Sequence, residues 1–324
     1  MESDRGHPTR SVLEGAQGGR DGGDDAHHRR QAMSVNRMPG HLPRSYLYVP
    51  GDAADKLAKV LTREADAIIV DLEDAVAPSA KDKARELAAT WLASLPQSAT
   101  ERPEVWVRIN PGRTGRTDVL AVQHPALTGL CLPKVSAPAD IEDLHRLLGE
   151  QEVDRAGAPI VLQPLIETAR GLLGVVHIAT APRVRQLQLG EFDLGADLGI
   201  ERGREDLEFL PARLQLVVAS VAAGIDPPVG PVAVDFTDLD RFAESTRALK
   251  RLGYRSRACI HPAQVAVVNE VFTPTTIEIE RARALVASSQ HATEEGSGVW
   301  QVENGTMIDE AVVRAARRLL GECR

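Results

Sequence analysis

Residues 164–200, PLIETARGLLGVVHIATAPRVRQLQLGEFDLGADLGI, contain the pattern from which we infer the fold. Two acids, Glu167 and Asp193, each follow an apolar run that is typical of a buried strand. A helix-like segment, residues 168–181, lies between them. A right-handed crossover sets two such strands parallel and side by side, so we expect both carboxylates to leave the same C-terminal edge of a sheet.

Two like-charged carboxylates at one edge repel each other, and a bound cation or a shared proton offsets that repulsion. Hard oxygen ligands in so small a number suit Mg²⁺, with Mn²⁺ as the second choice, because these ions keep positions for water or substrate oxygens. The alternative interpretation is structural, with Glu167 capping the following helix and Asp193 capping a turn. The spacing alone leaves both interpretations open.

Composition narrows the class of protein. The 324-residue chain has a formal net charge of -8, which argues against nucleic acid as a partner because phosphate binding needs a basic face. The three cysteines are far apart and form no C-x-x-C pair, so we expect neither a zinc nor a redox motif, and a reducing cytoplasm is the expected compartment. No apolar run of about 18 residues is present, and we expect no membrane association.

Short apolar runs with little alternation recur along the chain, as expected for parallel strands covered on both faces. Helical segments separate them, and Gly149, Gly224 and Gly253 stand where three of these helices should end. Eight strands alternating with helices over about 230 residues predict a closed (β/α)8 TIM barrel. An open doubly wound sheet is the alternative, but no G-x-G-x-x-G follows the first strand. The predicted strands are residues 45–49, 67–71, 105–110, 129–133, 160–166, 186–190, 232–235 and 257–261.

Catalytic groups of a TIM barrel come from the C-terminal ends of its strands. Any single polar residue at such a position is explained by a cap or a loop, but a set of them predicts an active site. We expect His261 to be a packed strand-end histidine rather than a catalytic one. The polar residues at the predicted strand ends are Asp71, Glu73, Asp74, Arg108, Asn110, Lys134, Glu167, Asp193, Asp235 and His261.

The two ends of the chain differ in character. Residues 1–40 hold few large apolar side chains, so they are predicted to be a disordered tail. The barrel is expected to span residues 41–290. Residues 291–324 are predicted to form a hairpin and an amphipathic helix, a C-terminal helical extension that serves as a lid over the barrel mouth or as an oligomer contact.

The motifs of the chain resemble, in order, those of the citrate lyase beta-subunit branch of the HpcH/HpaI aldolase family. Its members are Mg²⁺-dependent (β/α)8-barrel lyases that act on 3-hydroxyacyl-CoA thioesters such as citryl-CoA and malyl-CoA. The matching segments are RSYLYVPGDAADKLAK (44–59), DAIIVDLEDAVAPSAKDKAR (66–85), VWVRINP (105–111), GLCLPKVS (129–136), PLIETARGLLGVVHIA (164–179), LGEFDLGADLG (189–199), IHPAQVAVVN (260–269) and NGTMIDEAVV (304–313).

The resemblance implies roles for individual residues. Glu167 and Asp193 become the metal ligands, and Arg108 contacts the substrate. Asp309 is implied to reach the barrel mouth of a neighbouring subunit, where it moves the proton at the thioester α-carbon. We therefore expect a homo-oligomer, a trimer or a hexamer. Asp74 stands where the pyruvate-aldolase branch has a histidine, which favours the lyase branch.

Other charged residues are assigned supporting roles. Glu73 and Asp74 are expected to hold Arg108 or a metal-bound water. Arg44, Lys56 and Lys59 are expected to contact CoA phosphates. Lys134 either supplies positive charge to the site or makes a structural ion pair.

The expected function is that of a Mg²⁺-dependent carbon–carbon lyase. It would cleave a 3-hydroxyacyl-CoA of the citryl-CoA, malyl-CoA or citramalyl-CoA type into acetyl-CoA, or a related acyl-CoA, and a 2-oxo acid. The alternatives are a condensing enzyme or thioesterase of the malate synthase type, and a CoA- or dicarboxylate-binding subunit of a multi-protein lyase. The chain departs from its relatives at residues 253–257, GYRSR for G-F-x-G-K, and at residues 304–311, NGTMIDEA for D-G-K-M-I-D-x-P.

Overall fold

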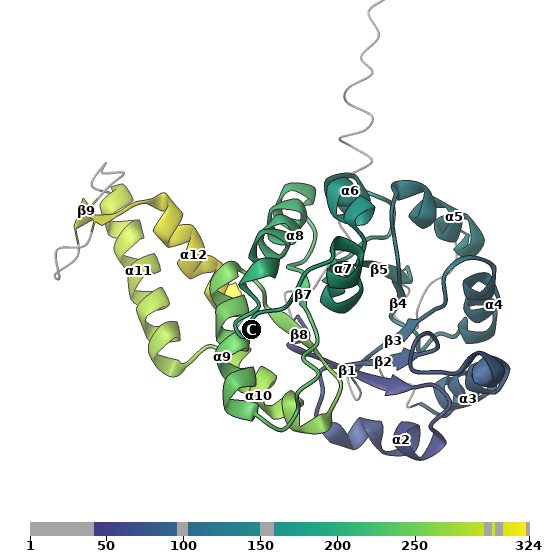
Figure 1. Ribbon diagram of the computed structural model, residues 1–324. Helices are drawn as coiled ribbons and strands as arrows, with labels where there is room; N and C mark the ends of the chain where they lie inside the picture. Colours follow the sequence, from purple (N-terminus) through teal and green to yellow (C-terminus); the bar gives the residue numbers. More distant parts are fainter. Residues whose placement is uncertain (1–41, 96–102, 150–158, 295–299, 302–306, 322–324) are drawn as a thin grey trace, which may run out of the picture. The chain divides into compact units, whose positions relative to one another are not determined.

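A computed structural model describes residues 42–95, 103–149, 159–294, 300–301 and 307–321 of the chain. Eight parallel strands close into a barrel in the order β1 to β8, and helices surround it (Figure 1). The predicted TIM barrel is confirmed, and the open-sheet alternative is wrong. The predicted tail, residues 1–40, lies outside the described residues. The strands are β1 (Ser45–Pro50), β2 (Ala67–Asp71), β3 (Glu104–Arg108), β4 (Gly129–Leu132), β5 (Val161–Ile166), β6 (Gln188–Leu189), β7 (Val229–Gly230) and β8 (Ser256–Cys259).

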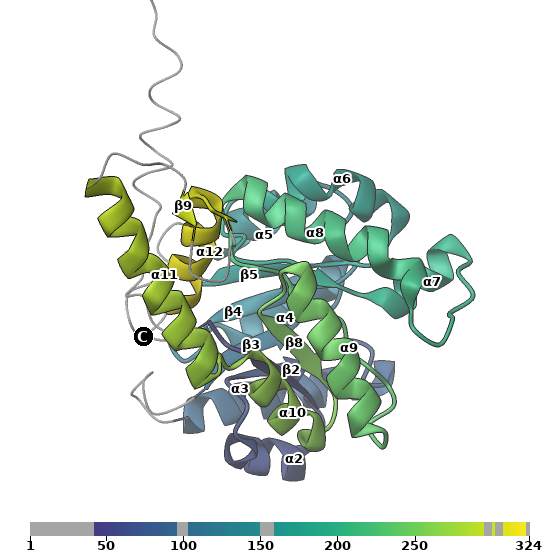
Figure 2. The same cartoon turned by 90° about the vertical axis from the view of Figure 1, so that its left-hand side faces the viewer.

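The strands carry apolar residues on both faces because both faces are buried. All five residues of β2 are buried. Successive side chains of a strand point to opposite faces, so Ile69 packs inside the barrel while Ile68 and Val70 pack outward against helices. The inner cluster consists of Tyr46, Ala67, Ile69, Trp106, Cys131, Leu165, Val229 and Ala258. Figure 2 shows the strands enclosed by this helical layer.

The helices end where glycine was predicted to end them. Gly149, Gly224 and Gly253 follow α5 (Pro138–Leu148), α8 (Leu210–Ala223) and α9 (Leu239–Leu252). Their φ values of 67°, 68° and 108° lie in a region that glycine adopts without strain. The helices around the strands are α2 (Ala54–Lys59), α3 (Lys81–Ser94), α4 (Gly112–Val122), α5 (Pro138–Leu148), α6 (Ala169–Ala179), α7 (Glu191–Leu198), α8 (Leu210–Ala223), α9 (Leu239–Leu252) and α10 (Pro262–Phe272).

The seventh strand lies earlier than the sequence predicts. β7 is Val229–Gly230, and the predicted strand at residues 232–235 is wrong. Pro231 has no N–H to donate to a ladder, so pairing ends before it. Asp235 therefore stands in an exposed loop, where its Oδ1 accepts from Thr237 N at 2.9 Å and Asp238 N at 3.2 Å.

A chain of hydrogen bonds crosses the barrel interior below the strand C-terminal ends. Gln186 donates to Tyr46 Oη at 2.8 Å and also to Gln163, which in turn donates to Gln188. Tyr48 Oη donates to Gln188 Oε1 at 3.2 Å. Buried polar groups that hydrogen-bond to one another in this way stiffen the barrel interior beneath the strand ends.

Beyond α10 the chain forms α11 (Thr276–Glu294), a short hairpin of β9 (Trp300–Gln301) and β10 (Met307–Ile308), and α12 (Glu310–Gly321). The two hairpin strands are antiparallel, and α11 packs against α12. The role of this extension as a lid stays a prediction. None of the helices in the described ranges is long and apolar enough to cross a membrane.

Candidate active site

The C-terminal ends of neighbouring strands bring the predicted polar residues to one edge of the barrel. Asp71 of β2 is the register partner of Arg108 of β3. Ile166 of β5 is the partner of Leu189 of β6, so Glu167 and the start of α7 leave the barrel side by side. Parallel strands place their C-terminal ends on one face, and that face is where TIM-barrel enzymes bind substrates.

Arg108 lies at the centre of an acidic cluster. Its Nε donates to Asp71 Oδ1 at 2.8 Å and its Nη2 to Asp71 Oδ2 at 2.6 Å, a bidentate pair. Its Nη1 lies 2.9 Å from Glu73 Oε2 and 3.7 Å from the more exposed Asp74. The guanidinium sits over the ring of Tyr48. Burial opposes the charge of Arg108, but the Asp71 hydrogen bonds and the charge of Glu73 raise its pKa above the usual value.

Glu73 is held on the inner side of this cluster. Burial raises the pKa of its carboxyl group, and the charges of Arg108 and Lys134 oppose that rise. Its Oε1 accepts from Lys134 Nζ at 3.2 Å. The contact of Oε2 with Arg108 lacks hydrogen-bond geometry, so among the described residues this buried oxygen has an ion-pair neighbour but no hydrogen-bond donor. Among the described residues, Glu73 Oε2 is therefore held by its charge interaction with Arg108 alone.

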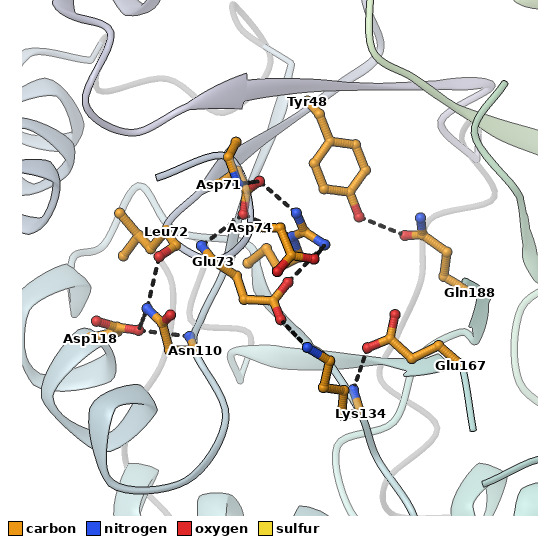
Figure 3. Close-up of polar contacts among 12 residues, drawn as sticks. Tyr48, Asp71, Leu72, Glu73, Asp74, Asn110, Asp118, Lys134, Glu167 and Gln188 are labelled. Carbon is orange, nitrogen blue, oxygen red and sulfur yellow. Dashed lines mark hydrogen bonds and ion pairs between the residues drawn. The ribbon is translucent and has the colours of Figure 1, made fainter. Parts of the chain in front are cut away.

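Glu167 follows β5 and is only 2% exposed. Its Oε1 accepts from the backbone N–H of Lys134 at 2.6 Å (Figure 3). Burial raises its pKa to about 7, with the Lys134 hydrogen bond opposing the rise and the charge of Asp193 adding to it. The cap of α6 is Thr168, whose side chain accepts from Gly171 N, so the interpretation of Glu167 as a helix cap is wrong.

Asp193 lies in the first turn of α7, half-buried and near enough to Glu167 for its charge to affect that group. Glu191 in the same turn fixes the start of the helix. Its carboxylate accepts from Arg213 Nε at 2.6 Å and from Arg202 Nη2 at 3.1 Å. Gly190 permits the close approach of the two strand ends, because a Cβ there would lie 2.5 Å from Glu167 Oε2.

These donors fit a divalent cation that keeps positions for solvent or substrate. Glu167 Oε2 and the Asp193 carboxylate accept no hydrogen bond from another described residue, which leaves their oxygens open. Within the described ranges no group of three or more His, Cys, Asp or Glu side chains is placed to hold a metal. Two carboxylate ligands suit Mg²⁺ better than an ion that needs an all-protein cage.

Lys134 links the two halves of the site. It follows β4 with φ 56°, a left-handed conformation that is uncommon outside glycine. Its backbone N–H contacts Glu167 and its side chain contacts Glu73. Together with Asn110 and Arg116 it also lines a cavity of about 210 Å³ beside the site.

Four residues that were expected at the site lie apart from this cluster or were assigned to another subunit. Arg44 precedes β1, at the opposite end of the barrel, where its Nε pairs with Asp66 Oδ2 at 2.7 Å. This placement does not fit the expected contact with CoA phosphates at the mouth. Lys56 is exposed on α2, after the C-terminal end of β1, as is Lys59. Asp309 is exposed and caps α12, accepting from Val312 N at 3.0 Å.

His261 is a helix cap, as its Nδ1 accepts from Ala263 N at 3.2 Å, and its ring stacks on Phe236. It is a packed residue, as expected.

Sequence reasoning missed the roles of three residues. Asp71, not Glu73 or Asp74, is the bidentate partner of Arg108, and the register of adjacent strand ends was the signal that would have identified it. The contribution of the Lys134 N–H and the close packing at Gly190 carry no signal in the sequence, because both depend on backbone geometry.

A closed barrel with a carboxylate pair and a clamped arginine at its strand ends has the architecture of an enzyme active site. A sequence model described as HpcH/HpaI aldolase/citrate lyase matches residues 44–262. The chain belongs to this family and is an enzyme of the lyase class.

Individual relatives agree with this assignment. The chain is 34% identical to a citrate lyase subunit beta-like protein of Deinococcus radiodurans over 87% of this chain and 98% of the relative. It is 33% identical to a (3S)-malyl-CoA thioesterase of Cereibacter sphaeroides over 87% of this chain and 95% of the relative. The structure resembles protein CitE of Mycobacterium tuberculosis in complex with magnesium, acetoacetate and coenzyme A, with a TM-score of 0.71, 27% identity and coverage of 89% and 100%.

Proposed function

We propose that the protein is a Mg²⁺-dependent carbon–carbon lyase that cleaves a 3-hydroxyacyl-CoA thioester of the citryl-CoA, malyl-CoA or citramalyl-CoA type. The products are acetyl-CoA, or a related acyl-CoA, and a 2-oxo acid. One observation carries the proposal: Glu167 and Asp193, each with open oxygens, leave adjacent strands at the edge that also holds Arg108. The magnesium, acetoacetate and coenzyme A bound to the CitE relative support the same chemistry.

Cleavage between C2 and C3 needs removal of the proton from the C3 hydroxyl while the thioester fragment leaves as an enolate. A divalent ion held by Glu167 and Asp193, Mg²⁺ or Mn²⁺, would polarise the hydroxyl and carboxylate oxygens of the substrate and lower the pKa of that hydroxyl. The protein holds the two acids in place through the Lys134 N–H and the Glu191 clamp on α7.

Arg108 is the group that orients the substrate. Asp71 accepts from Nε and Nη2 of Arg108, and Glu73 lies against Nη1. The guanidinium is therefore fixed before substrate binds. The Nη N–H groups that Asp71 does not occupy bind a substrate carboxylate or stabilise the enolate oxygen as charge develops. Asp74 lies on the exposed side of Arg108 and completes its acidic surroundings.

The enolate must take up a proton at its α-carbon before acetyl-CoA leaves. We assign this step to Asp309 of a neighbouring subunit in a homo-oligomer, because its exposed carboxyl stands at the start of α12. Lys56 on α2 lies after the C-terminal end of β1, which suits it to contact CoA. Arg44 is left out of the proposed site.

A second candidate is hydrolysis of the thioester, alone or after condensation, which the (3S)-malyl-CoA thioesterase relative favours. A direct assay separates the two. The isolated chain is incubated with citryl-CoA, malyl-CoA or citramalyl-CoA and Mg²⁺, while the 2-oxo acid and free thiol are measured in parallel. Cleavage releases 2-oxo acid without thiol, whereas hydrolysis releases thiol without 2-oxo acid. A chain that only binds CoA within a larger lyase releases neither.

A further inference from the structure

Among the described residues of the site, Lys134 contacts two acids that follow different strands of the barrel. Its backbone N–H donates to Glu167 Oε1 at 2.6 Å, and its Nζ donates to Glu73 Oε1 at 3.2 Å. Figure 3 shows Lys134 between these two carboxylates. The N–H sets which oxygen of Glu167 stays open, and the ammonium sets the position of Glu73 beside Arg108.

The backbone of Lys134 is strained where glycine would be relaxed. At φ 56° a side chain crowds the backbone, and glycine adopts this conformation freely. Glycine would keep the N–H to Glu167 but would lose the ammonium. The chain therefore carries a lysine at a position where glycine would suit the backbone better, which points to a role for the lysine side chain.

The charge balance of the cluster points the same way. Asp71, Glu73, Asp74 and Glu167 crowd one edge, and Arg108 alone contacts three of them. Glu73 is only 4% exposed, so without a second cation its charge would be poorly compensated. The side chain of Lys134 is 43% exposed, so its Nζ reaches Glu73 from the solvent side of the site.

We propose that Lys134 is a positioning residue of the lyase reaction, whose ammonium holds Glu73 against Arg108 while its backbone N–H orients Glu167. The proposal rests on the proposed function for its kinetic readout. It assigns Lys134 no contact with the reacting atoms. Loss of the ammonium lets Glu73 move, and Arg108 then loses the ion-pair partner that lies against its Nη1.

The test replaces Lys134 by glycine. Lys134→Gly relieves the backbone strain and keeps the N–H, so we expect an unchanged or higher melting temperature and unchanged Mg²⁺ affinity. Turnover of the acyl-CoA substrate should fall about 10- to 100-fold, the usual loss when a supporting contact of an active site is removed. Glu64→Gly is the matched control, because Glu64 is exposed and has φ 58° away from the site.

Chemical rescue separates positioning from a purely structural role. Propylammonium chloride should restore much of the lost turnover of Lys134→Gly, since it returns an N–H-bearing cation to the vacated space. Tetramethylammonium chloride at equal ionic strength has no N–H and should not. Turnover of Lys134→Gly near the wild-type value would overturn the proposal, and so would a loss that propylammonium leaves unchanged.

Crystal structures of the wild type and of Lys134→Gly provide a readout that does not depend on turnover. We expect the Glu73 carboxylate to move away from Arg108 in the variant and to return with propylammonium bound. Should the wild type cleave no acyl-CoA, the proposed function fails while the positions of Glu73 still decide the role of Lys134. An unmoved Glu73 in the variant would overturn the positioning role.

Discussion

Replacing Glu167 by glutamine tests the electrostatics of the site through protein stability. In the metal-free protein, burial raises the pKa of Glu167 from 4.5 to about 7, so between these values the folded state holds a proton that the unfolded state has released. The stabilising contribution of this group is complete below its unfolded pKa and is lost as the pH rises through its folded pKa. The free energy of unfolding therefore falls between about pH 4.5 and pH 7.

The size of the effect follows from the shift. Each pKa unit corresponds to about 1.4 kcal/mol, so the carboxylate destabilises the folded metal-free protein by about 3 kcal/mol above neutral pH. Glu167→Gln keeps an oxygen that accepts from the Lys134 N–H, and it cannot ionise. We expect the variant to lack this pH dependence and to be more stable than the wild type by up to about 3 kcal/mol near pH 8.

Urea unfolding in EDTA, followed by tryptophan fluorescence from about pH 5 to about pH 8, measures this difference. Glu86→Gln on the exposed face of α3 is the control and should keep the wild-type pH dependence. Added Mg²⁺ should stabilise the wild type and not Glu167→Gln, because a ligand stabilises the state that binds it. Equal pH slopes for the wild type and Glu167→Gln would refute the reasoning.

Three further substitutions examine the proposed roles. Arg108→Lys should lose about 3 kcal/mol of transition-state stabilisation, roughly 100-fold in kcat/KM, because a point charge replaces a bidentate fork, and near wild-type kinetics would make Arg108 structural. Gly190→Ala should lower Mg²⁺ affinity in calorimetry by about 10- to 100-fold, because its Cβ would lie 2.5 Å from Glu167 Oε2. The control Gly174→Ala, whose Cβ would have its nearest atom at 3.6 Å, should match the wild type. Asp309→Ala should lose turnover but keep Mg²⁺ affinity, and mixing it with Glu167→Gln subunits should restore part of the activity. A monomer in light scattering or a fully active Asp309→Ala variant would exclude a role in trans.

The barrel was predictable because its strands are buried on both faces. Parallel strands covered in this way read as short apolar runs, and the intervening helices end at glycines such as Gly224 and Gly253. The same reading failed at β7, where the apolar residues 232–234 follow Pro231, and pairing had already ended. An apolar run alone does not determine which residues enter the ladder.

The placement of the site was predictable only in part. Right-handed crossovers bring strand ends together, so the proximity of Glu167 and Asp193 followed from chain order. Contacts that depend on register or backbone conformation did not, and these include the pairing of Asp71 with Arg108 and the left-handed turn at Lys134. The prediction for Arg44 failed for a different reason. Its position next to the first strand in the sequence does not determine which end of the barrel it occupies.

Glu167 and Asp193 are proposed to hold a divalent ion. Isothermal titration of Mg²⁺ into the wild type, Glu167→Gln, Asp193→Asn and the control Glu86→Gln near pH 8 measures whether they do. We expect one saturable Mg²⁺ site in the wild type and in Glu86→Gln, and no such site in Glu167→Gln or Asp193→Asn. Unchanged Mg²⁺ affinity in either ligand variant would contradict the account.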